Sequence, residues 1–355
     1  MKTNRLARVM AGMEKMNLSQ LLVTSTESIY YLTGQWIAPG ERLLALLIGE
    51  GGPRLFVNHM FAVPPVEGLE LVEFDDAEDS VAALAAFVAP GPIGVDKAWP
   101  SRFLLSLMEK RGDVRPVIGS KPVDDARMLK DAEEIEGLRR SSRMNDRVTG
   151  ALRKSLVEGE TELDVARRYD AIAASEGATG LGFSALVCFG AGCAEPHHAT
   201  GKTRLQKGDA VILDVGLNVD HSLSDMTRTV FFGSATDEQK KVYDIVRRAN
   251  AAGKAAVRPG VRLSDIDRAA RAVIEEAGYG KQFLHRTGHG LGLEVHEPPD
   301  VSAVSPYAAQ PGMVFSIEPG VYLAGKFGVR VEDLVLVTED GCESLNELDR
   351  DFMIV

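Results

Sequence analysis

The stretch VILDVGLNVDHSLSDMTRTVFF, residues 211–232, carries the strongest information on the fold. Two apolar runs flank a polar centre, which predicts a β-hairpin. With a turn centred on Val219 and Asp220, Asp214 lies directly opposite Asp225. Opposite side chains share one face of the sheet, with Cβ atoms about 5 Å apart. Two ionised carboxylates held that close on a buried face need a cation, or one of them keeps its proton. In the alternative interpretation, the turn lies elsewhere or one aspartate faces solvent.

A second stretch, MVFSIEPGVYLAGKFGVRVEDLVLV (313–337), has the same organisation. Glu318 and Glu332 are symmetric about Gly325, so a hairpin turn at that glycine places the two glutamates opposite each other. Asp333 follows Glu332, and the alternation of side chains along a strand sends one inward and the other outward. The alternative is that one glutamate forms a surface salt bridge.

The histidines are concentrated in two short segments. HRTGHGLGLEVHE (285–297) surrounds one of them, His289, with glycine and threonine, so the backbone there can approach another group closely. EPHHAT (195–200) supplies two more. A single histidine is more often a packed or surface residue, but five of the seven histidines fall in these two segments. They are His197, His198, His285, His289 and His296.

Four carboxylates and one imidazole form a hard, oxygen-rich ligand set. Such a set suits Mn²⁺, Co²⁺, Zn²⁺ or Fe²⁺ better than a metal that prefers thiolates. Two ions about 3.5 Å apart, bridged by carboxylates, can hold a hydroxide that is nucleophilic at neutral pH. The sequence has no phosphate-binding glycine loop and no GxSxG elbow. We therefore expect a two-metal hydrolase.

Composition sets limits on the partners. Lys and Arg total 40 against 51 Asp and Glu, giving a net charge of −11, which argues against a protein built to hold nucleic acid or an anionic membrane. Three cysteines imply no disulfide framework. The N-terminal residues lack the apolar core of a signal peptide, and no apolar run is long enough to span a membrane. We expect a cytoplasmic protein.

The chain of 355 residues predicts two domains. Residues 1–125 alternate between strand and helix patterns, which indicates a small α/β domain. Residues 119–130 form the predicted linker, and 126–355 contain longer amphipathic helices followed by hairpins. Predicted strands of the first domain are 21–24, 42–48, 55–57, 71–74, 93–96 and 114–118; predicted helices are 79–89, 101–111, 131–157, 236–257 and 263–277, with a further helix starting at Thr161.

Five motifs occur in order: PHHATG, LDVG…SDMTRT, RTGHGLGLEVHE, SIEPG and GVRVED. Together they resemble the "pita-bread" M24 metallopeptidases, which include prolidase, aminopeptidase P and methionine aminopeptidase. The resemblance covers residues 130–355. The first third, with YYLTG (30–34) and GERLLAL (40–46), is similar to the creatinase-type amino domain of prolidase and aminopeptidase P. The implied fold class is α+β: a creatinase-like α/β amino domain and a pita-bread catalytic domain with a curved antiparallel sheet.

The resemblance also implies a ligand set for two divalent ions per subunit. Asp214 would chelate one ion, Asp225 and Glu332 would bridge the two, and His289 and Glu318 would complete the coordination. Mn²⁺ or Co²⁺ is the expected metal, with Zn²⁺ or Fe²⁺ as alternatives. Homodimers are usual in this family, so we expect a homodimer.

Further roles follow from the same resemblance. Glu318 would also shuttle a proton from the attacking water to the leaving nitrogen, and His197 and His296 would hold the substrate carbonyl. The family favours proline after the scissile bond, and Phe183 is the candidate for the wall that receives its ring. His198 and His285 match no such role and are expected to be structural.

The substrate length is the harder question. A dipeptidase must neutralise the free carboxylate of its substrate, usually with arginine. Some prolidases place that arginine just after the VHE motif, but this chain has HEPPDVSAV, with Asp300 and no arginine. Arg42, from the partner subunit of a dimer, could supply the charge, although it could equally be a surface arginine beside Glu41. We expect an Xaa-Pro dipeptidase acting on proline-containing dipeptides or short peptides.

Three other functions are compatible with the same motifs. An Xaa-Pro aminopeptidase would act on longer peptides. A creatinase-like amidinohydrolase would use the fold without metal, and a catalytically silent domain would only bind peptides. Because both latter classes lose metal ligands and this chain keeps all five, we rank them below the peptidase.

Overall fold

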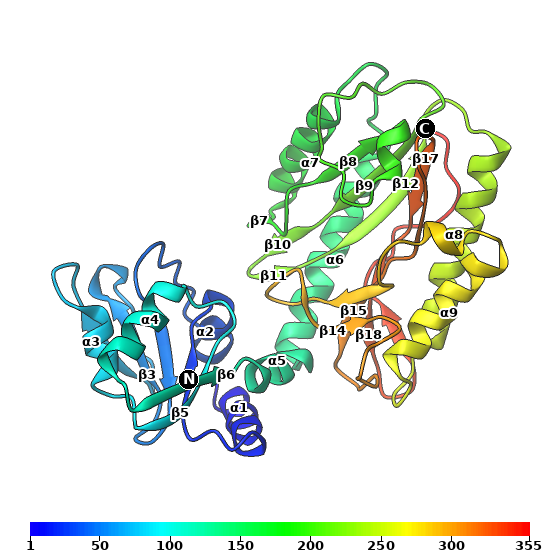
Figure 1. The fold of residues 1–355 in the computed structure, drawn as a ribbon. Helices are drawn as coiled ribbons and strands as arrows, with labels where there is room; N and C mark the ends of the chain where they lie inside the picture. The colour runs from blue at the N-terminus through cyan, green and yellow to red at the C-terminus, as the bar shows by residue number, and fades with distance from the viewer. The chain divides into compact units, whose positions relative to one another are not determined.

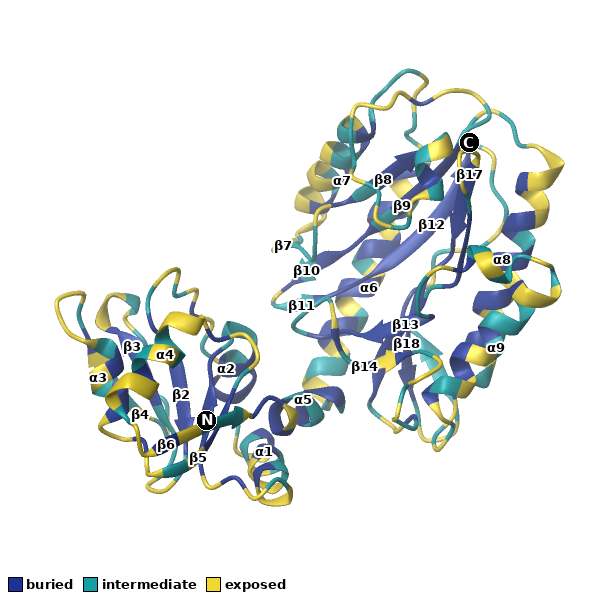
Figure 2. Ribbon diagram, viewed as in Figure 1, coloured by how far each residue is buried: buried dark blue, intermediate teal, exposed yellow.

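The computed structural model describes residues 1–355 and divides into two units, Met1–Arg127 and Met128–Val355 (Figure 1). Each unit has hydrophobic clusters of its own. In both units most strands are buried and the helices expose one face, as the colours of Figure 2 show. The family resemblance predicted this order of an α/β amino domain and an α+β catalytic domain, and the prediction is confirmed.

The amino unit is built on a six-stranded mixed sheet with the order β4-β3-β2-β1-β5-β6. The central β1 (Leu21–Val23) is fully buried and pairs antiparallel with β2 and parallel with β5. An uninterrupted apolar run is typical of a strand covered on both faces. All six strands coincide with predicted ones. The other strands are β2 (Ala45–Ile48), β3 (Arg54–Asn58), β4 (Glu70–Phe74), β5 (Gly91–Val95) and β6 (Val114–Ile118).

Helices pack beside this sheet and complete its core. Ser25 begins α2 by accepting a hydrogen bond from the Ser28 amide, and Gly34, in the left-handed conformation, ends it. The helices of this unit are α1 (Thr3–Lys15), α2 (Thr26–Thr33), the 3₁₀ helix η1 (His59–Phe61), α3 (Ser80–Ala85) and α4 (Ser101–Lys110).

The predicted linker, 119–130, is wrong in one respect, because most of it is the helix α5 (Lys121–Met128). Pro122 was read as a break in the pattern. It occupies the first turn of α5, where a missing N–H costs no hydrogen bond. The next helix begins at Asp131 as expected, because Asp131 and Glu134 form a reciprocal capping box.

The second unit combines two helix pairs with antiparallel sheets. Helices α6 and α7 pack together against the strands β8 to β10, and α8 and α9 pack together against the later strands (Figure 1). Thr161 and Thr236 begin α7 and α8 with capping boxes. The helices are α6 (Ala132–Leu152), α7 (Glu162–Glu176), η2 (Gly190–Ala194), α8 (Asp237–Ala256), α9 (Leu263–Glu276) and η3 (Gly280–Gln282).

Strands far apart in the sequence form the sheets of this unit. Their orders are β11-β10-β7, β12-β9-β8, β14-β13-β15-β18-β19 and β16-β17. The strands are β7 (Gly180–Leu181), β8 (Leu186–Phe189), β9 (Ala210–Val215), β10 (Leu217–Val219), β11 (Ser222–Leu223), β12 (Met226–Phe231), β13 (Gly288–Gly290), β14 (Glu297–Val301), β15 (Val314–Ile317), β16 (Gly320–Leu323), β17 (Phe327–Arg330), β18 (Asp333–Val337) and β19 (Cys342–Ser344).

The register predicted for the first hairpin is wrong by two residues. β9 and β12 pair Asp214 with Thr227 rather than with Asp225. The turn lies at Asp220 and His221, which have φ values of 50° and 66°. Asp and His tolerate this left-handed region, which a tight hairpin turn requires. A shift of two residues keeps each side chain on its face, so the two aspartates lie diagonally on the same side.

The second hairpin has the predicted register. Ile317 pairs with Asp333 in the ladder of β15 and β18, and Gly320 pairs with Arg330 in that of β16 and β17. Both ladders are symmetric about Gly325, which has a φ of 72° in the turn. The glutamates 318 and 332 therefore lie across from each other, in the gap between the two ladders.

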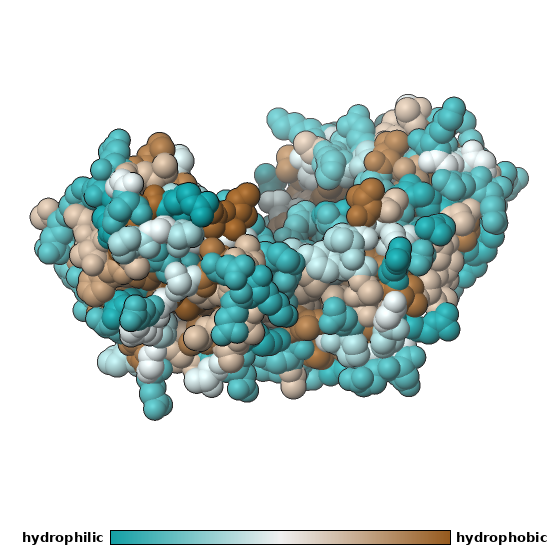
Figure 3. All heavy atoms as spheres, turned by 60° about the horizontal axis from the view of Figure 1, so that its bottom comes forward, coloured by the Kyte–Doolittle hydropathy of each residue, from teal (hydrophilic) through white to brown (hydrophobic).

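No helix combines the length and the apolar character needed to cross a membrane. On the face drawn in Figure 3, hydrophilic side chains predominate and hydrophobic ones are scattered among them.

Candidate metal centre

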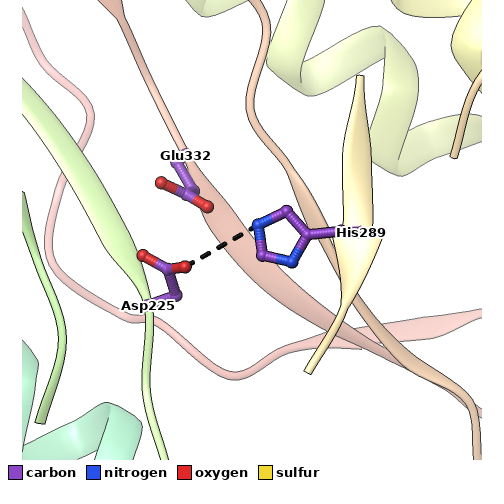
Figure 4. A group of neighbouring side chains, drawn as sticks. All are labelled: Asp225, His289 and Glu332. Carbon is purple, nitrogen blue, oxygen red and sulfur yellow. Dashed lines mark ion pairs between the residues drawn. The ribbon is translucent and has the colours of Figure 1, made fainter. Parts of the chain in front are cut away.

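Three buried side chains from separate parts of the second unit converge on one point (Figure 4). Asp225 comes from the junction of β11 and β12, His289 from β13, and Glu332 from the junction of β17 and β18. One ligand atom of each lies within 4.8 Å of the others. Three residues spread over more than a hundred positions, Asp225, His289 and Glu332, thus offer two carboxylates and an imidazole to a single ion.

Glycines on both sides of His289 let β13 fit between its neighbours. A Cβ atom on Gly288 would lie 1.8 Å from the carbonyl oxygen of Ser316, and one on Gly290 would lie 2.4 Å from that of Pro298. Both contacts are with backbone, which cannot turn aside. The close approach predicted for this segment is therefore to β15 on one side and β14 on the other.

The hydrogen bonding of His289 defines which nitrogen is available for a metal. Its Nδ1 lies 3.0 Å from the carbonyl oxygen of Gly290, and because a carbonyl only accepts, Nδ1 carries the proton. Nε2 therefore presents a lone pair 3.8 Å from a carboxylate oxygen of Asp225 and 3.4 Å from one of Glu318. Burial, followed by the neighbouring His296, lowers the pKa of His289 to about 3. A cation, rather than a proton on Nε2, best fits these facing acceptors.

The carboxylates give the same indication. Asp225 Oδ1 and Glu332 Oε1 are buried without a hydrogen-bond partner. Burial and the charges of neighbouring carboxylates raise the pKa of Asp225 and of Glu332 well above their ordinary values. Unsatisfied buried carboxylate oxygens are costly, and a divalent ion removes that cost. The residues present therefore fit a bound metal.

The other two predicted ligands lie at the edge of this cluster. Asp214 accepts a 2.5 Å hydrogen bond from the buried guanidinium of Arg330. Glu318 accepts a 3.2 Å hydrogen bond from Ser316, whose hydroxyl in turn accepts from the amide of His289. Burial raises the pKa of Glu318 to about 7. Burial of a carboxylate without a compensating cation produces such a raised pKa, as it does for Asp225 and Glu332.

All five predicted ligands line one cavity of about 640 Å³, here called the catalytic cavity. Apolar side chains form part of its wall, including Phe183, as predicted. His197 and His296 also line it, and the His296 ring packs edge-on against His289 with 4.3 Å between centroids. The complete lining is Phe183, Ser184, Leu186, Pro196, His197, Asp214, Asp225, His285, Arg286, His289, Val295, His296, Glu318, Arg330 and Glu332.

Two side chains of this cavity, His285 and Arg330, were not predicted from the sequence to belong to it. His285 was expected to be structural, but it lines the cavity and its Nε2 lies 2.8 Å from the hydroxyl of Tyr322. Arg330 donates to the same hydroxyl at 2.8 Å and to Thr227. The available signal was the spacing in GVRVED, because Arg330 is two residues before Glu332 and so shares its face.

His198 lies away from this network, in agreement with the prediction. Its Nε2 is 3.0 Å from the buried carboxylate of Glu162. That carboxylate also accepts from the backbone amides of Phe189 and Gly201. The pair therefore ties α7 to the loop around residue 200 and has a structural role.

Asp333 is not directed toward solvent, which corrects the prediction for the pair Glu332–Asp333. It lies fully buried on the opposite face of β18 and bonds three cations. Its carboxylate oxygens are 2.8 Å from Arg228, 2.7 Å from Lys254 and 2.6 Å from Arg350. Burial alone would raise the pKa of Asp333, but the three cations outweigh it and hold the pKa well below its ordinary value. We call these four residues the back-face cluster.

Comparison with known proteins agrees with this geometry. Residues 136–339 match the model of metallopeptidase family M24, and residues 5–129 match that of the creatinase/prolidase N-terminal domain. The chain belongs to metallopeptidase family M24. The sequence-based prediction of this family, and of a peptidase, is confirmed.

Relatives in the family cover the whole chain. A Mycobacterium tuberculosis protein named as the probable dipeptidase PepE is 36% identical over 99% of this chain and 96% of its own length. The crystal structure of a prolidase from Thermococcus sibiricus is 32% identical, with a TM-score of 0.95 over 100% of this chain and 99% of that one. An X-Pro aminopeptidase from Thermotoga maritima is 29% identical, with a TM-score of 0.85 over 96% and 99%.

Arg42 lies in the amino unit of this M24 chain, in the segment before β2. Its guanidinium forms two 2.8 Å hydrogen bonds with Asp76 and a 3.0 Å ion pair with Glu41. The two acids are largely exposed. A role for Arg42 in recognising the substrate carboxylate stays a prediction.

Proposed function

We propose that this protein is an Xaa-Pro dipeptidase, a prolidase, that uses two divalent ions to hydrolyse the peptide bond before proline. The observation that carries the proposal is the convergence of five side chains of metal-binding type on the wall of one cavity, where Arg330 pairs with Asp214 alone and oxygens of Asp225 and Glu332 have no partner. The dipeptidase and prolidase relatives support it. Buried carboxylate oxygens without a partner also disfavour a metal-free amidinohydrolase or a silent binding domain.

The ligand roles in this proposal are the predicted ones. Asp214, Asp225, His289, Glu318 and Glu332 would hold the two ions. When bound, the ions polarise the peptide carbonyl and make water acidic enough to supply a nucleophile at neutral pH. We propose Mn²⁺ or Co²⁺, with Zn²⁺ or Fe²⁺ as alternatives, because the set contains oxygen and imidazole but no thiolate.

The remaining steps belong to side chains of the chain itself. Glu318 takes a proton from the attacking water and delivers it to the departing proline nitrogen. Protonation is essential because the nitrogen would otherwise have to leave as a strongly basic anion. His197 and His296 donate hydrogen bonds to the substrate carbonyl oxygen as it becomes negative. Burial lowers the pKa of His296, so it acts as a neutral N–H donor at neutral pH.

Phe183 is the proposed contact for the pyrrolidine ring. It lines the catalytic cavity close to the backbone of Gly216, where a Cβ atom would lie 2.5 Å from the Phe183 ring. The missing side chain at position 216 lets the ring approach the strand that carries Asp214. A flat apolar wall beside the ligands is suited to a ring that has no N–H to satisfy.

The second candidate is an Xaa-Pro aminopeptidase. It is favoured by a smaller cavity of about 330 Å³ that shares Arg286 and His296 with the catalytic cavity. That space could receive residues beyond the proline. The likeness to the Thermotoga maritima X-Pro aminopeptidase supports the same reading.

Hydrolysis of Ala-Pro beside Ala-Pro-Ala separates these functions. Chelated protein is assayed first, and then again after addition of Mn²⁺ or Co²⁺. Metal-dependent cleavage mainly of the dipeptide is the expected result. Cleavage mainly of the tripeptide would establish the aminopeptidase instead, and cleavage of neither by metal-loaded protein would exclude both.

A further inference from the structure

The catalytic cavity contains two arginines and no lysine. A free dipeptide carboxylate bound there needs a cationic partner, since an unpaired charge is costly to desolvate. In Xaa-Pro the carboxylate is only three bonds beyond the scissile carbonyl carbon. Its partner must therefore lie next to the residues that hold that carbonyl. This reasoning rests on the proposed dipeptidase function, since only that function brings a carboxylate so close.

Arg330 does not meet the requirement. Its side chain is 4% exposed, and its guanidinium already donates to Asp214 and Tyr322. A third donor, Nε, bonds the hydroxyl of Thr227. Arg330 already forms hydrogen bonds within the protein, and its charge is paired with the carboxylate of Asp214.

Arg286 meets each requirement. Its side chain is 35% exposed, and its Nη1 pairs with Asp300, which is itself 54% exposed. A guanidinium has five N–H donors, so donors remain for a second, bidentate acceptor. Arg286 lies at the start of the segment that leads into β13, three residues before His289.

The two cavities define the side from which an anion reaches Arg286. Arg286 and His296 line both the catalytic cavity and the smaller one, whereas Asp300 lines only the smaller one. A carboxylate that enters from the catalytic cavity thus meets the guanidinium on the side away from Asp300.

We propose that Arg286 binds the free α-carboxylate of the Xaa-Pro dipeptide, and that Asp300 holds its guanidinium at the wall between the two cavities. Arg286 is then a specificity-determining residue. It selects substrates whose carboxylate follows the proline directly, and it makes a contribution from the amino unit unnecessary.

Binding of a non-hydrolysable pair of ligands tests this assignment. The reduced isostere of Ala-Pro, with CH₂ in place of the scissile carbonyl, is compared with its C-terminal carboxamide by calorimetry on Mn²⁺-loaded protein. Arg286→Gln should weaken the free acid about 10- to 100-fold and the amide less than about threefold, because a charge-assisted bidentate pair is lost only with the acid. Arg42→Ala tests the competing candidate for the same carboxylate, and it should change neither ligand by more than about twofold.

Asp300→Asn provides a second variant that keeps the arginine but removes the carboxylate that holds its guanidinium. It should weaken the free acid by about two- to fivefold and leave the amide unchanged. Equal losses for acid and amide in Arg286→Gln would overturn the proposal, as would a selective loss in Arg42→Ala instead. Hydrolysis of Ala-Pro by wild-type protein is measured in parallel. If Ala-Pro is not cleaved, the proposed function fails, while the preference for the free acid still decides the role of Arg286.

Discussion

Glu332 and Asp333 are neighbours in sequence and face opposite environments. Asp333 has three cations around it, and each is a residue of the protein. Glu332 has one hydroxyl partner, Thr227, and a second oxygen with none. Both are almost fully buried. The two buried carboxylates therefore differ in one property only. Cations of the protein compensate the charge of Asp333, whereas no cation of the protein pairs with Glu332, as is expected of a carboxylate that binds a metal.

Substitution of a predicted metal ligand should lower catalytic activity and leave the fold intact. Glu318→Gln should lower kcat by on the order of 10²–10⁴-fold, because the amide cannot shuttle a proton. Substrate binding should persist where metal is retained. Steady-state kinetics on Ala-Pro with Mn²⁺, together with metal analysis, measures both effects.

Glu343→Gln is the matched control for this substitution. Glu343 pairs with Arg139 at the partly exposed β19, far from the cavity lining. Its replacement should leave kcat within about twofold. A Glu318→Gln protein with near-normal kcat would exclude the shuttle role.

Substitution in the back-face cluster should have the opposite effect, a loss of stability with metal binding retained. Asp333→Asn should destabilise the protein by about 3–5 kcal/mol, because it leaves Arg228 buried without a charged partner. Urea denaturation of metal-loaded protein measures the loss. The protein that remains folded should still bind metal. A variant of unchanged stability that cannot bind metal would contradict the distinction between the two faces.

Removal of metal should give stability an unusual dependence on pH. In metal-free protein the pKa of Glu318 is about 7, against an ordinary value of 4.5. Between these values the folded state holds a proton that the unfolded state has lost, so the stability that Glu318 contributes is present below its ordinary pKa of 4.5 and is lost as pH rises to about 7. Asp225 and Glu332, with raised pKa values, act in the same direction. His285 and His289, whose pKa values burial lowers to about 4 and about 3, act in the opposite direction at acidic pH.

The expected loss between pH 5 and pH 8 is on the order of 3 kcal/mol for Glu318 alone. Thermal melts of chelated protein across this range measure it. Metal-loaded protein is the control and should show little slope, because the ions replace the protons. Comparison of chelated wild-type protein with chelated Glu318→Gln separates this carboxylate from the histidines, and an unchanged pH dependence in the variant would show that Glu318 is neutralised by other means.

The smallest effect should come from Tyr322, whose hydroxyl lies between Arg330 and His285. Tyr322→Phe removes the hydroxyl that accepts from Arg330 and contacts His285. One lost hydrogen bond of this kind should lower kcat/KM about tenfold and the stability by about 1 kcal/mol. Kinetics and melting of the same preparation measure the two. Loss of metal binding in this variant would assign the hydroxyl a larger role than orientation.

The sequence was most informative where chemistry and periodicity agree. The strand runs of the amino unit, the capping residues Asp131 and Thr161, and the symmetry about Gly325 could all be predicted from local patterns. They depend on neighbours a few residues apart, so the sequence contains the whole signal.

Features that depend on distant contacts could not be predicted. The hairpin turn at Asp220 and His221 needed two left-handed residues that lack the usual glycine. The burial of Asp333 depends on cations from α8, β12 and the C-terminal segment, and no spacing rule connects them. The exposure of Arg286 depends on the two adjoining cavities, both of which it borders. In each case tertiary structure decided between local alternatives.

The two glycines beside His289 extend the active site to positions that carry no functional group. An alanine at Gly288 or Gly290 would meet backbone at 1.8 or 2.4 Å and displace β13, although every ligand would remain in the sequence. A comparison restricted to the metal-binding residues would therefore find no defect in a variant with alanine at Gly288 or Gly290. In a genome, a chain with a complete set of metal-binding residues and a methyl group at either position would be an inherited loss of the enzyme, recognisable only from the space that the methyl group occupies.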